Sequence, residues 1–314
     1  MAAQTDSGAL VPLPEGLYPY GRGRRLPKPD KSVRRLDLGV VIILDALGFK
    51  GIWSRENAGA VLKCMRALRR TGVELQGADK GGALLVDTGL RHRVRCMSDT
   101  IVVTVIVRGP NAPMRGLYKA MLSGVMIAGS IIFDALGRTP ALLFRGCVAA
   151  GRMKEDMDFL IGPAVDEAAE RFEKADGPFL WLAPSALDVC RRYEATYLER
   201  IEQTLMVPYR LPLNNGAWAK TRVFTHFCVT QDKEARMKTR QRILEAFGNN
   251  VLAPSVEQKR ENVVKFFEHV ERIAESGGWK KNRPAFRWPD WEDLSPAQRL
   301  RLAVHRAQTK KTEP

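Results

Sequence analysis

The strongest constraint on this chain is an apolar segment at residues 40–49, Val-Val-Ile-Ile-Leu-Asp-Ala-Leu-Gly-Phe. Its first five residues carry no charge, which is typical of a strand buried on both faces of a sheet. An ionised carboxylate such as Asp45 at the end of a buried strand costs free energy unless it caps a helix or meets a cation. Strand ends of open α/β sheets are also where ligands collect, so Asp45 is a candidate functional residue.

Charge and composition narrow the class of protein. The 314 residues are 45% hydrophobic, which allows one large domain with appendages. The net charge of +15 attracts polyanions such as nucleic acid, anionic membranes or nucleotide phosphates. Because much of the excess lies in residues 21–35 and 280–311, we assign it to solvated tails and faces, and nucleic acid is not an expected partner.

Cysteine spacing and hydropathy indicate a cytoplasmic protein. The five cysteines are scattered without a Cys-x-x-Cys pair, which argues against a disulfide framework and a zinc site. The first residues do not resemble a signal peptide. The longest apolar segment, 117–136, includes Lys119 and Asp134, so we expect a buried helix and no integral membrane segment.

Hydrophobic periodicity predicts alternating strands and helices after the first strand. Residues 52–70 have helical spacing, and Gly72 is placed to end that helix. Two apolar strands flank Ser98-Asp99, a two-residue turn that puts Asp99 at a hairpin tip. The elements expected up to residue 200 are strands at 93–97 and 101–107, a helix at 113–137, a strand at 142–151, a helix at 162–174, a strand at 179–183 and a helix at 184–200.

The first six elements follow the order βαββαβ, the ferredoxin-like split arrangement, so the predicted fold class is α+β. In that arrangement the first strand and the hairpin lie side by side at the centre of the sheet. A second hairpin around Asn214-Asn215-Gly216 and two more helices, at 232–247 and 255–276, are expected to follow. We divide the chain into a flexible basic arm at 1–35, a core domain at 36–230, and a helical appendage with a basic tail at 231–314.

Asp45 and Asp99 are predicted to approach each other where the first strand ends beside the hairpin tip. Two carboxylates without a nearby histidine suit hard divalent cations, and the carbonyl of Ala46 offers another hard oxygen. Two such cations about 3.5–4 Å apart can clamp the attacking and leaving oxygens of a phosphoryl displacement. The turn at Gly48 and Phe49 would let backbone N–H groups face a phosphate chain.

Four segments in the same order resemble the class III nucleotidyl cyclases, over about residues 36–185. Ile-Leu-Asp-Ala-Leu-Gly-Phe at 43–49 is similar to their Asp-(Ile/Leu)-x-Gly-Phe strand end, and Met-Ser-Asp-Thr-Ile-Val-Val at 97–103 to their Gly-Asp hairpin. Arg-Gly-Cys-Val-Ala-Ala-Gly at 145–151 is similar to their Arg-x-Gly-x-x-x-Gly strand, one position tighter at the arginine. Residues 161–171 are similar to their Gly-x-x-Val-Asn-x-Ala-x-Arg helix start.

The resemblance implies a role for each matching residue. Asp45 and Asp99 are catalytic and hold two divalent cations, Mn²⁺ or Mg²⁺, with the Ala46 carbonyl as a further ligand. Gly48 and Phe49 contact the triphosphate of a nucleoside triphosphate substrate. Such domains work as head-to-tail pairs with shared sites, so one copy per chain implies a homodimer with active sites at the interface. Residues 36–230 are then the cyclase catalytic domain.

Departures from the family concern the base, the ribose and the transition-state charge. Arg95 and Phe159 stand where adenylate cyclases recognise adenine, and the pair that recognises guanine is absent as well. Asp166 replaces the Asn that orients the ribose, so we retain all three as candidate nucleotide contacts. Glu170 replaces the transition-state Arg, and the cations that could supply this charge or contact the phosphates are Arg171, Arg145, Arg210 and Lys220.

These departures and the helical appendage resemble the bacterial Pycsar pyrimidine cyclases, which make cyclic nucleotides from UTP or CTP during phage infection. The implied products are cyclic UMP or cyclic CMP and pyrophosphate, and the implied partner is a separate effector that the cyclic nucleotide activates. Uracil presents two carbonyl acceptors to a donor such as Arg95, which favours UTP.

Alternatives stay open at this stage. One is an adenylate cyclase. Palm-type nucleotidyltransferases and diguanylate-type cyclases share the fold and the metals, although residues 96–99 lack the Gly-Gly-Asp/Glu hairpin of the latter. A catalytically inactive, cyclase-like nucleotide-binding protein is favoured by the residues at 166 and 170 and opposed by the two retained aspartates. A nucleic-acid-binding protein would show a steep salt dependence of affinity.

Overall fold

The computed structural model describes residues 36–49, 52, 56–78, 89–108, 113–156, 159–192, 205–226, 228, 232–248 and 253–276. The chain divides into Met1–Leu36 and Asp37–Pro314, and every element below belongs to the second unit. In chain order the elements are β1 (Asp37–Ala46), α1 (Ala58–Ala78), β2 (Leu90–Met97), β3 (Thr100–Val107), α2 (Pro113–Leu136), β4 (Phe144–Glu155), β5 (Leu160–Ile161), α3 (Pro163–Arg171), β6 (Leu180–Leu182), α4 (Pro184–Arg192), β7 (Met206–Pro212), β8 (Trp218–Phe224), α6 (Lys233–Ala246) and α7 (Pro254–Glu275).

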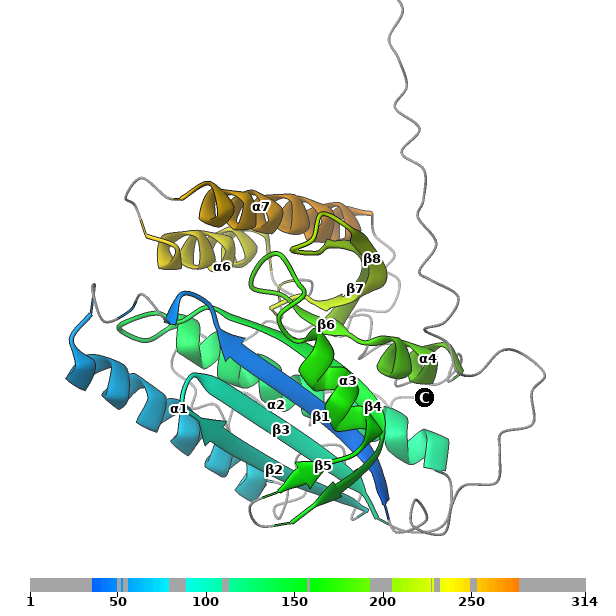
Figure 1. Cartoon of the computed structure of the whole chain (residues 1–314). Coiled ribbons are helices and arrows are strands. Elements are labelled where there is room, and N and C mark those ends of the chain that lie inside the picture. The colour runs from blue at the N-terminus through cyan, green and yellow to red at the C-terminus, as the bar shows by residue number, and fades with distance from the viewer. Residues whose placement is uncertain are drawn as a thin grey trace, which may run out of the picture. The chain divides into compact units, whose positions relative to one another are not determined.

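Strand β1 lies inside the sheet and is paired along both of its edges. The strand order is β2-β3-β1-β4-β6-β8-β7, with β5 paired to β4 outside this path (Figure 1). β1 runs antiparallel to β3 and to β4, and its residues 40–44 are buried. The uncharged segment therefore forms a strand buried on both faces, as predicted. The βαββαβ order and the α+β fold class are confirmed.

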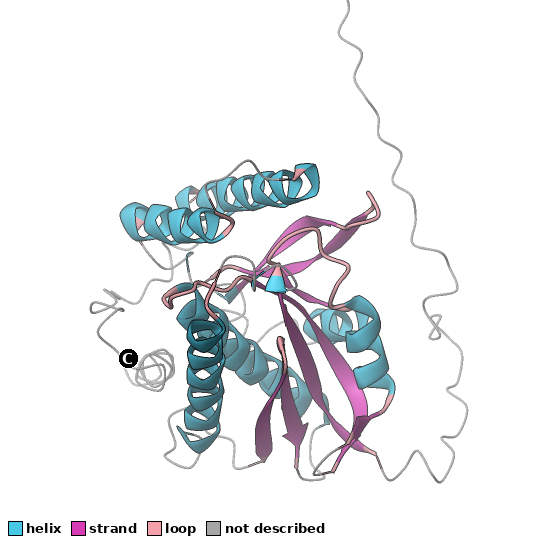
Figure 2. Ribbon diagram, turned by 60° about the vertical axis from the view of Figure 1, so that its left-hand side comes forward, coloured by secondary structure: helices cyan, strands magenta, loops and turns pink. Residues whose placement is uncertain are grey.

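Side chains along β1 alternate between two separate cores, because helices lie on both sides of the sheet (Figure 2). Val40, Ile42 and Leu44 pack in one core with residues of α1, α2 and α4, and we call this side the α2 face. Val41 and Ile43 pack in the other core with residues of α3 and α7, and we call this side the α3 face.

Helix α2 is buried around most of its surface because it packs against the sheet as well as against α1 and α4. Among the described helices, only its segment Gly116–Leu136 is long and apolar enough by composition to cross a bilayer, and 83% of the apolar window is buried inside the protein. In this fold α2 is a core helix. The residues predicted to share its packing face are all buried: Leu117, Met121, Val125, Ala128, Ile132 and Leu136.

Several predicted boundaries were wrong. The first helix begins at Ala58 and not at residue 52, β2 begins at Leu90 and not at residue 93, and α3 ends at Arg171 and not at residue 174. Two further errors concern glycines. Gly72 does not end a helix, because it lies inside α1, which begins at Ala58 and ends at Ala78. A Cβ atom at Gly72 would lie 2.7 Å from Cγ1 of Val94, so this glycine lets α1 approach β2 closely. Gly151 does not end its strand either, since β4 continues to Glu155. Residues 193–200, predicted to continue α4, lie outside the described residues.

The contact at Gly72 predicts the effect of a small substitution. Gly72→Ala should destabilise the fold by about 1 kcal/mol, because overpacking against Val94 outweighs the gain in helix propensity. In a Val94→Ala background the same change should be neutral or stabilising. Urea unfolding of the four proteins of this cycle measures the coupling, and an equal cost in both backgrounds would contradict the contact.

His226 is a fully buried histidine in the core beneath α7. Its ring stacks on Phe267 with centroids 6.0 Å apart, and no hydrogen bond within the described residues reaches its Nδ1 atom. Burial favours the neutral imidazole and lowers the pKa of His226 to about 4.

Stability should therefore fall as the pH drops from about 6.5 to about 4. In this window the unfolded chain binds a proton at His226 that the folded chain excludes, and the loss should approach about 3 kcal/mol. Urea unfolding at several pH values measures it. His226→Asn, a residue that tolerates the positive φ of 52°, serves as the control and should flatten this part of the pH profile. A profile unchanged by the substitution would assign the pH dependence to other groups.

Candidate active site

Asp45 occupies the carboxyl end of β1, where the ladder fixes its neighbours. It lies opposite Thr100 of β3 on one side and opposite Arg145 of β4 on the other. Its place in the alternation puts its side chain on the α3 face, together with Ile43. The carboxylate is mostly buried, with 14% of the side chain exposed. The position is therefore the end of a buried strand, as the sequence predicted.

Asp99 lies beside this corner because the β2–β3 hairpin turns there. Ser98 and Asp99 form the predicted two-residue turn, and Ser98 has a φ of 54°, an uncommon conformation for a residue other than glycine. The backbone N–H of Ala46 donates to the carbonyl of Asp99 at 3.1 Å. The structure thus brings Asp45, Ala46 and Asp99 together, although residues 47–98 separate Ala46 from Asp99 along the sequence.

Arg145 is the counter-charge of Asp45. Its Nε and Nη2 atoms donate to Oδ2 of Asp45 at 3.2 and 3.1 Å. Its Nη1 atom donates to the carbonyl of Glu173 at 2.9 Å, and the Glu173 carboxylate lies 3.6 Å from Nη2. Among the candidate cations Arg171, Arg145, Arg210 and Lys220, Arg145 is the one that contacts Asp45 in the described structure.

Burial is the largest influence on the ionisation of Asp45 and raises its pKa. The Arg145 guanidinium lowers the pKa through its charge and hydrogen bonds, whereas the negative charges of Asp99 and Glu173 raise it again. The net shift is upward, so Arg145 does not fully compensate the carboxylate. Because the Asp45 and Asp99 carboxylates lie close together and Arg145 offsets only part of their negative charge, binding of a further cation there would be favourable.

This donor set fits hard divalent cations in part. The carboxylates of Asp45 and Asp99 and the carbonyl of Ala46 are oxygen ligands of the kind that Mg²⁺ and Mn²⁺ prefer. Within the described ranges, no group of three His, Cys, Asp or Glu side chains could hold a metal by itself. Water and phosphate oxygens would have to complete the coordination, as is usual for Mg²⁺ bound with a nucleotide.

Gly48 and Phe49 follow β1 in a tight turn. Gly48 has a φ of 72°, in the region that glycine adopts without strain. The Phe49 ring is partly buried against the core on the α2 face. These contacts place the turn next to the Asp45 corner, while the phenyl ring itself anchors the turn to the core.

Arg95 binds an acidic residue that the sequence analysis did not single out. Its Nη1 atom donates to Oε1 of Glu155 at 2.5 Å, and its Nη2 atom donates to the carbonyl of Asp156 at 2.7 Å. The Glu155 side chain is only 1% exposed, and Thr104 donates to the same Oε1 at 2.7 Å. Two more arginines of β2, Arg91 and Arg93, lie 3.3 and 3.9 Å from this carboxylate.

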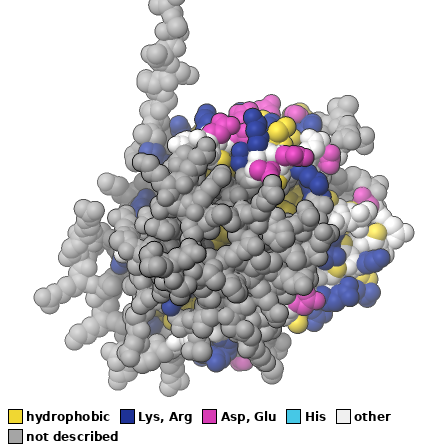
Figure 3. Space-filling model, turned by 180° about the vertical axis from the view of Figure 1, so that it is seen from behind, with side chains coloured by type: hydrophobic (Ala, Val, Ile, Leu, Met, Phe, Trp, Pro, Cys, Tyr) yellow, Lys and Arg dark blue, Asp and Glu magenta, His cyan; other side chains and the backbone are white. Residues whose placement is uncertain are grey.

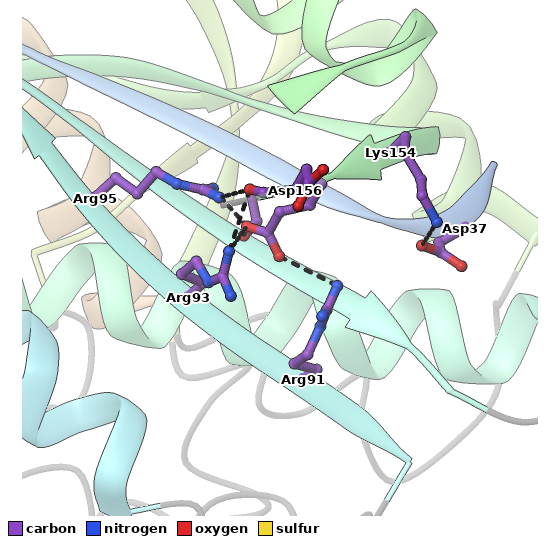
Figure 4. Close-up of polar contacts among 8 residues, drawn as sticks. Asp37, Arg91, Arg93, Arg95, Lys154 and Asp156 are labelled. Carbon is purple, nitrogen blue, oxygen red and sulfur yellow. Dashed lines mark hydrogen bonds and ion pairs between the residues drawn. The ribbon is translucent and has the colours of Figure 1, made fainter. Parts of the chain in front are cut away.

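Figure 4 shows the three arginines of β2 converging on the end of β4. Their spacing at alternate residues is the signal that could have predicted this cluster, because side chains at i, i+2 and i+4 of a strand share one face. Three guanidinium groups on one face require an anion. The sequence did not reveal which acid would supply it, since Glu155 reaches them from β4, and β3 and β1 lie between β2 and β4 in the sheet.

The other predicted residues make no hydrogen bond or ion pair with Asp45 in the part of the chain that the structure describes. Phe159 is 70% exposed in the connection between β4 and β5. Asp166 is exposed on the first turn of α3, and Arg171 near its end pairs with Glu167 at 3.7 Å. Lys220 is exposed on β8, and β4 and β6 lie between β8 and β1 in the sheet. The next residue, Thr221, points to the opposite face and is buried.

Glu155 should be important for stability. Glu155→Gln removes the carboxylate that compensates three arginines and should destabilise the fold by about 2 kcal/mol. Glu173→Gln is the matched control, because the Glu173 side chain is 60% exposed and should contribute less than about 0.5 kcal/mol. Urea unfolding at pH 7 compares them, and equal effects would contradict the structural role of Glu155.

Comparison with known proteins finds likeness at the level of structures only. No protein-family model matches the chain, and no curated protein sequence matches it. The guanylate cyclase domain of RhGC from Catenaria anguillulae, solved with GTP, is 14% identical with a TM-score of 0.40, and the match covers 60% of this chain and 96% of that one. The adenylyl cyclase CyaB from P. aeruginosa is 10% identical with a TM-score of 0.39, covering 60% and 93%.

A third similar structure is a class III adenylyl cyclase-like ATP-binding protein from Pseudomonas aeruginosa. It is 14% identical with a TM-score of 0.32, and the match covers 83% of this chain and 50% of that chain. The structural neighbours are thus adenylyl and guanylyl cyclase domains and a cyclase-like binding protein. At these identities and TM-scores they do not assign an activity or a substrate to the chain.

Proposed function

We propose that this chain is a nucleotidyl cyclase that converts a pyrimidine nucleoside triphosphate, UTP in preference to CTP, to its 3′,5′-cyclic monophosphate and pyrophosphate. The observation that carries the proposal is the meeting of Asp45 and Asp99. The register of β1 and β3 and the hydrogen bond from Ala46 to Asp99 hold the two residues at one corner of the sheet. Both belong to segments that resemble the metal-binding motifs of class III cyclases.

Asp45, Asp99 and the Ala46 carbonyl would hold two divalent cations, Mn²⁺ or Mg²⁺. When bound, such cations lower the pKa of a ribose 3′-hydroxyl and neutralise charge on the triphosphate. In the proposed reaction the 3′-hydroxyl loses its proton to solvent and its oxygen bonds to the α-phosphorus. The bond from that phosphorus to the oxygen bridging to the β-phosphate breaks, and pyrophosphate leaves. The role of the protein residues is positioning. β1 and the β2–β3 hairpin would hold both carboxylates on one side of the reacting phosphate.

Arg145 has a place in this mechanism because its guanidinium donates two hydrogen bonds to Asp45. Once Asp45 serves as a cation ligand, the Arg145 guanidinium is free to contact phosphate oxygens, with the Glu173 carbonyl still holding its Nη1 atom. A guanidinium offers five N–H donors, so it can keep the protein contact and still bind phosphate. We therefore favour Arg145 over Arg171, Arg210 and Lys220 as the phosphate contact contributed by this chain.

The base would be contacted by a second copy of the chain. Arg95 uses two of its five N–H donors on Glu155 and Asp156, and the rest can meet the two carbonyl acceptors of uracil. Met97, Phe159 and Ile161 are exposed apolar residues on the nearby hairpins, which suits burial in a homodimer with active sites at the interface. Asp166 on α3 is retained as the candidate ribose contact.

We place this activity in the cytoplasm of a bacterium, in defence against phage. The cyclic nucleotide would act as a second messenger that activates a separate effector protein. The support is the resemblance of the motif departures, at Arg95, Phe159, Asp166 and Glu170, to those of Pycsar pyrimidine cyclases.

An inactive nucleotide-binding protein is the second candidate. The observation that favours it is the exposed pair of Glu170 with Lys174 at 2.7 Å, where the related cyclases have a transition-state arginine. Such a protein would bind nucleoside triphosphates and release no pyrophosphate.

The substrate can be tested directly. The full-length protein is incubated with ATP, GTP, CTP or UTP and Mn²⁺, and the products are identified by mass spectrometry. We expect cyclic UMP as the main product. Cyclic AMP as the sole product would make the protein an adenylate cyclase, and nucleotide binding without any product would favour the inactive candidate.

Asp45→Asn and Asp99→Asn should each reduce cyclisation by at least about a thousandfold, because each removes a carboxylate on which cation binding depends. Asp37→Asn is the matched control. It removes a carboxylate from the other end of β1, where the Asp37 side chain is 41% exposed and pairs with Lys154, and it should leave the rate within about twofold. Circular dichroism verifies that all three variants fold. Cyclisation by either corner variant at the control rate would refute the assignment.

A further inference from the structure

Helix α1 presents a face on which exposed cations are grouped together. On one side its residues Val61, Cys64 and Leu68 are buried in the core on the α2 face. On the opposite side six exposed residues fall within an arc of about 120°, at 100° per residue of helix. We call these six the α1 basic face: Leu62, Lys63, Arg66, Arg69, Arg70 and Val73.

The four cations of the α1 basic face have no ion pair with any described residue. Several exposed cations elsewhere in the described helices are paired along the helix, as Arg192 is with Asp188 and Lys265 with Glu261. Within the described part of α1 the only acidic residue is Glu74. Four unpaired cations on one surface raise the local potential and attract a polyanion.

Two exposed aliphatic residues indicate which polyanion fits. Leu62 and Val73 are 49% and 55% exposed and lie at the two ends of the face, about 16 Å apart along the helix axis. Figure 3 shows lysines and arginines with hydrophobic side chains among them on the side of the molecule where α1 lies. Proteins that bind single-stranded nucleic acid stack its bases on aromatic side chains, and the α1 basic face has none. Aliphatic groups among cations suit the boundary between lipid headgroups and acyl chains.

We infer that the α1 basic face binds the anionic surface of a lipid bilayer, as a peripheral contact. The four cations would meet the headgroup phosphates, while Leu62 and Val73 enter the outermost apolar layer. The side chains of α1 pack on the α2 face of the sheet, whereas Asp45 lies on the α3 face. Docking through α1 would therefore leave the Asp45 corner accessible to a nucleotide.

The test is sedimentation of the full-length protein with vesicles. Equal parts of phosphatidylglycerol and phosphatidylcholine are compared with phosphatidylcholine alone, at several salt concentrations. The protein should bind the anionic vesicles at least tenfold more tightly, and salt should weaken the binding. A variant with Gln at all four cationic positions of the α1 basic face should lose at least tenfold in affinity.

The matched control replaces four exposed cations elsewhere, Arg192, Lys233, Arg260 and Lys265, with Gln. It has the same net charge and the same termini as the α1 variant, and its affinity should stay within about twofold of the natural protein. If the two quadruple variants lose affinity equally, or if the natural protein does not bind anionic vesicles, the inference is wrong.

The aliphatic residues separate a bilayer from other polyanions. Leu62→Ser with Val73→Ser should weaken vesicle binding about threefold or more without changing its salt dependence, because an apolar contribution is lost. No change in affinity would refute the bilayer inference, and so would tighter binding of a single-stranded oligonucleotide through the four cations. Cyclase activity measured in solution should be unchanged in every α1 variant.

Discussion

The pairing of β1 along both edges is the constraint on which the rest of the structure depends. A strand bonded to β3 and to β4 and covered on both faces has no edge or face open to water along its buried residues. Its side chains divide the interior into two cores, and its last polar residue must lie where the strand leaves the interior. Asp45 is at that point, and the register with β3 and β4 decides that it meets Asp99 and Arg145.

The sequence was sufficient for these features because they depend on local patterns. An uncharged run, a two-residue turn and the order of strands and helices are each visible over a few residues, and together they define the βαββαβ core. Gly72 shows where such reasoning failed. A glycine at this point of the sequence suggests the end of a helix. In the structure Gly72 instead makes room for the side chain of Val94 on β2, and the sequence alone does not show that β2 packs against α1.

The candidate site was predictable in the same uneven way. Asp45 and Asp99 were found because adjoining strands bring their ends together. The partner of Arg95 was not found, because Glu155 reaches it from β4 across two intervening strands, and no pattern within β2 names the residue that compensates its charge. Electrostatic partners that come from distant strands require the sheet order, which follows from the fold as a whole.

The alternation along β1 also limits how this protein can change. A deletion or insertion of one residue between Val40 and Asp45 would exchange the two faces of the strand beyond it. Asp45 would then point toward α2, where it would be a lone carboxylate among apolar side chains. A residue that faces α2 in the natural protein would take the place of Asp45 at the corner. A change of two residues would preserve the faces and shift the position along the strand. The site therefore requires an even change in the number of residues along β1 as well as the right residue at its end.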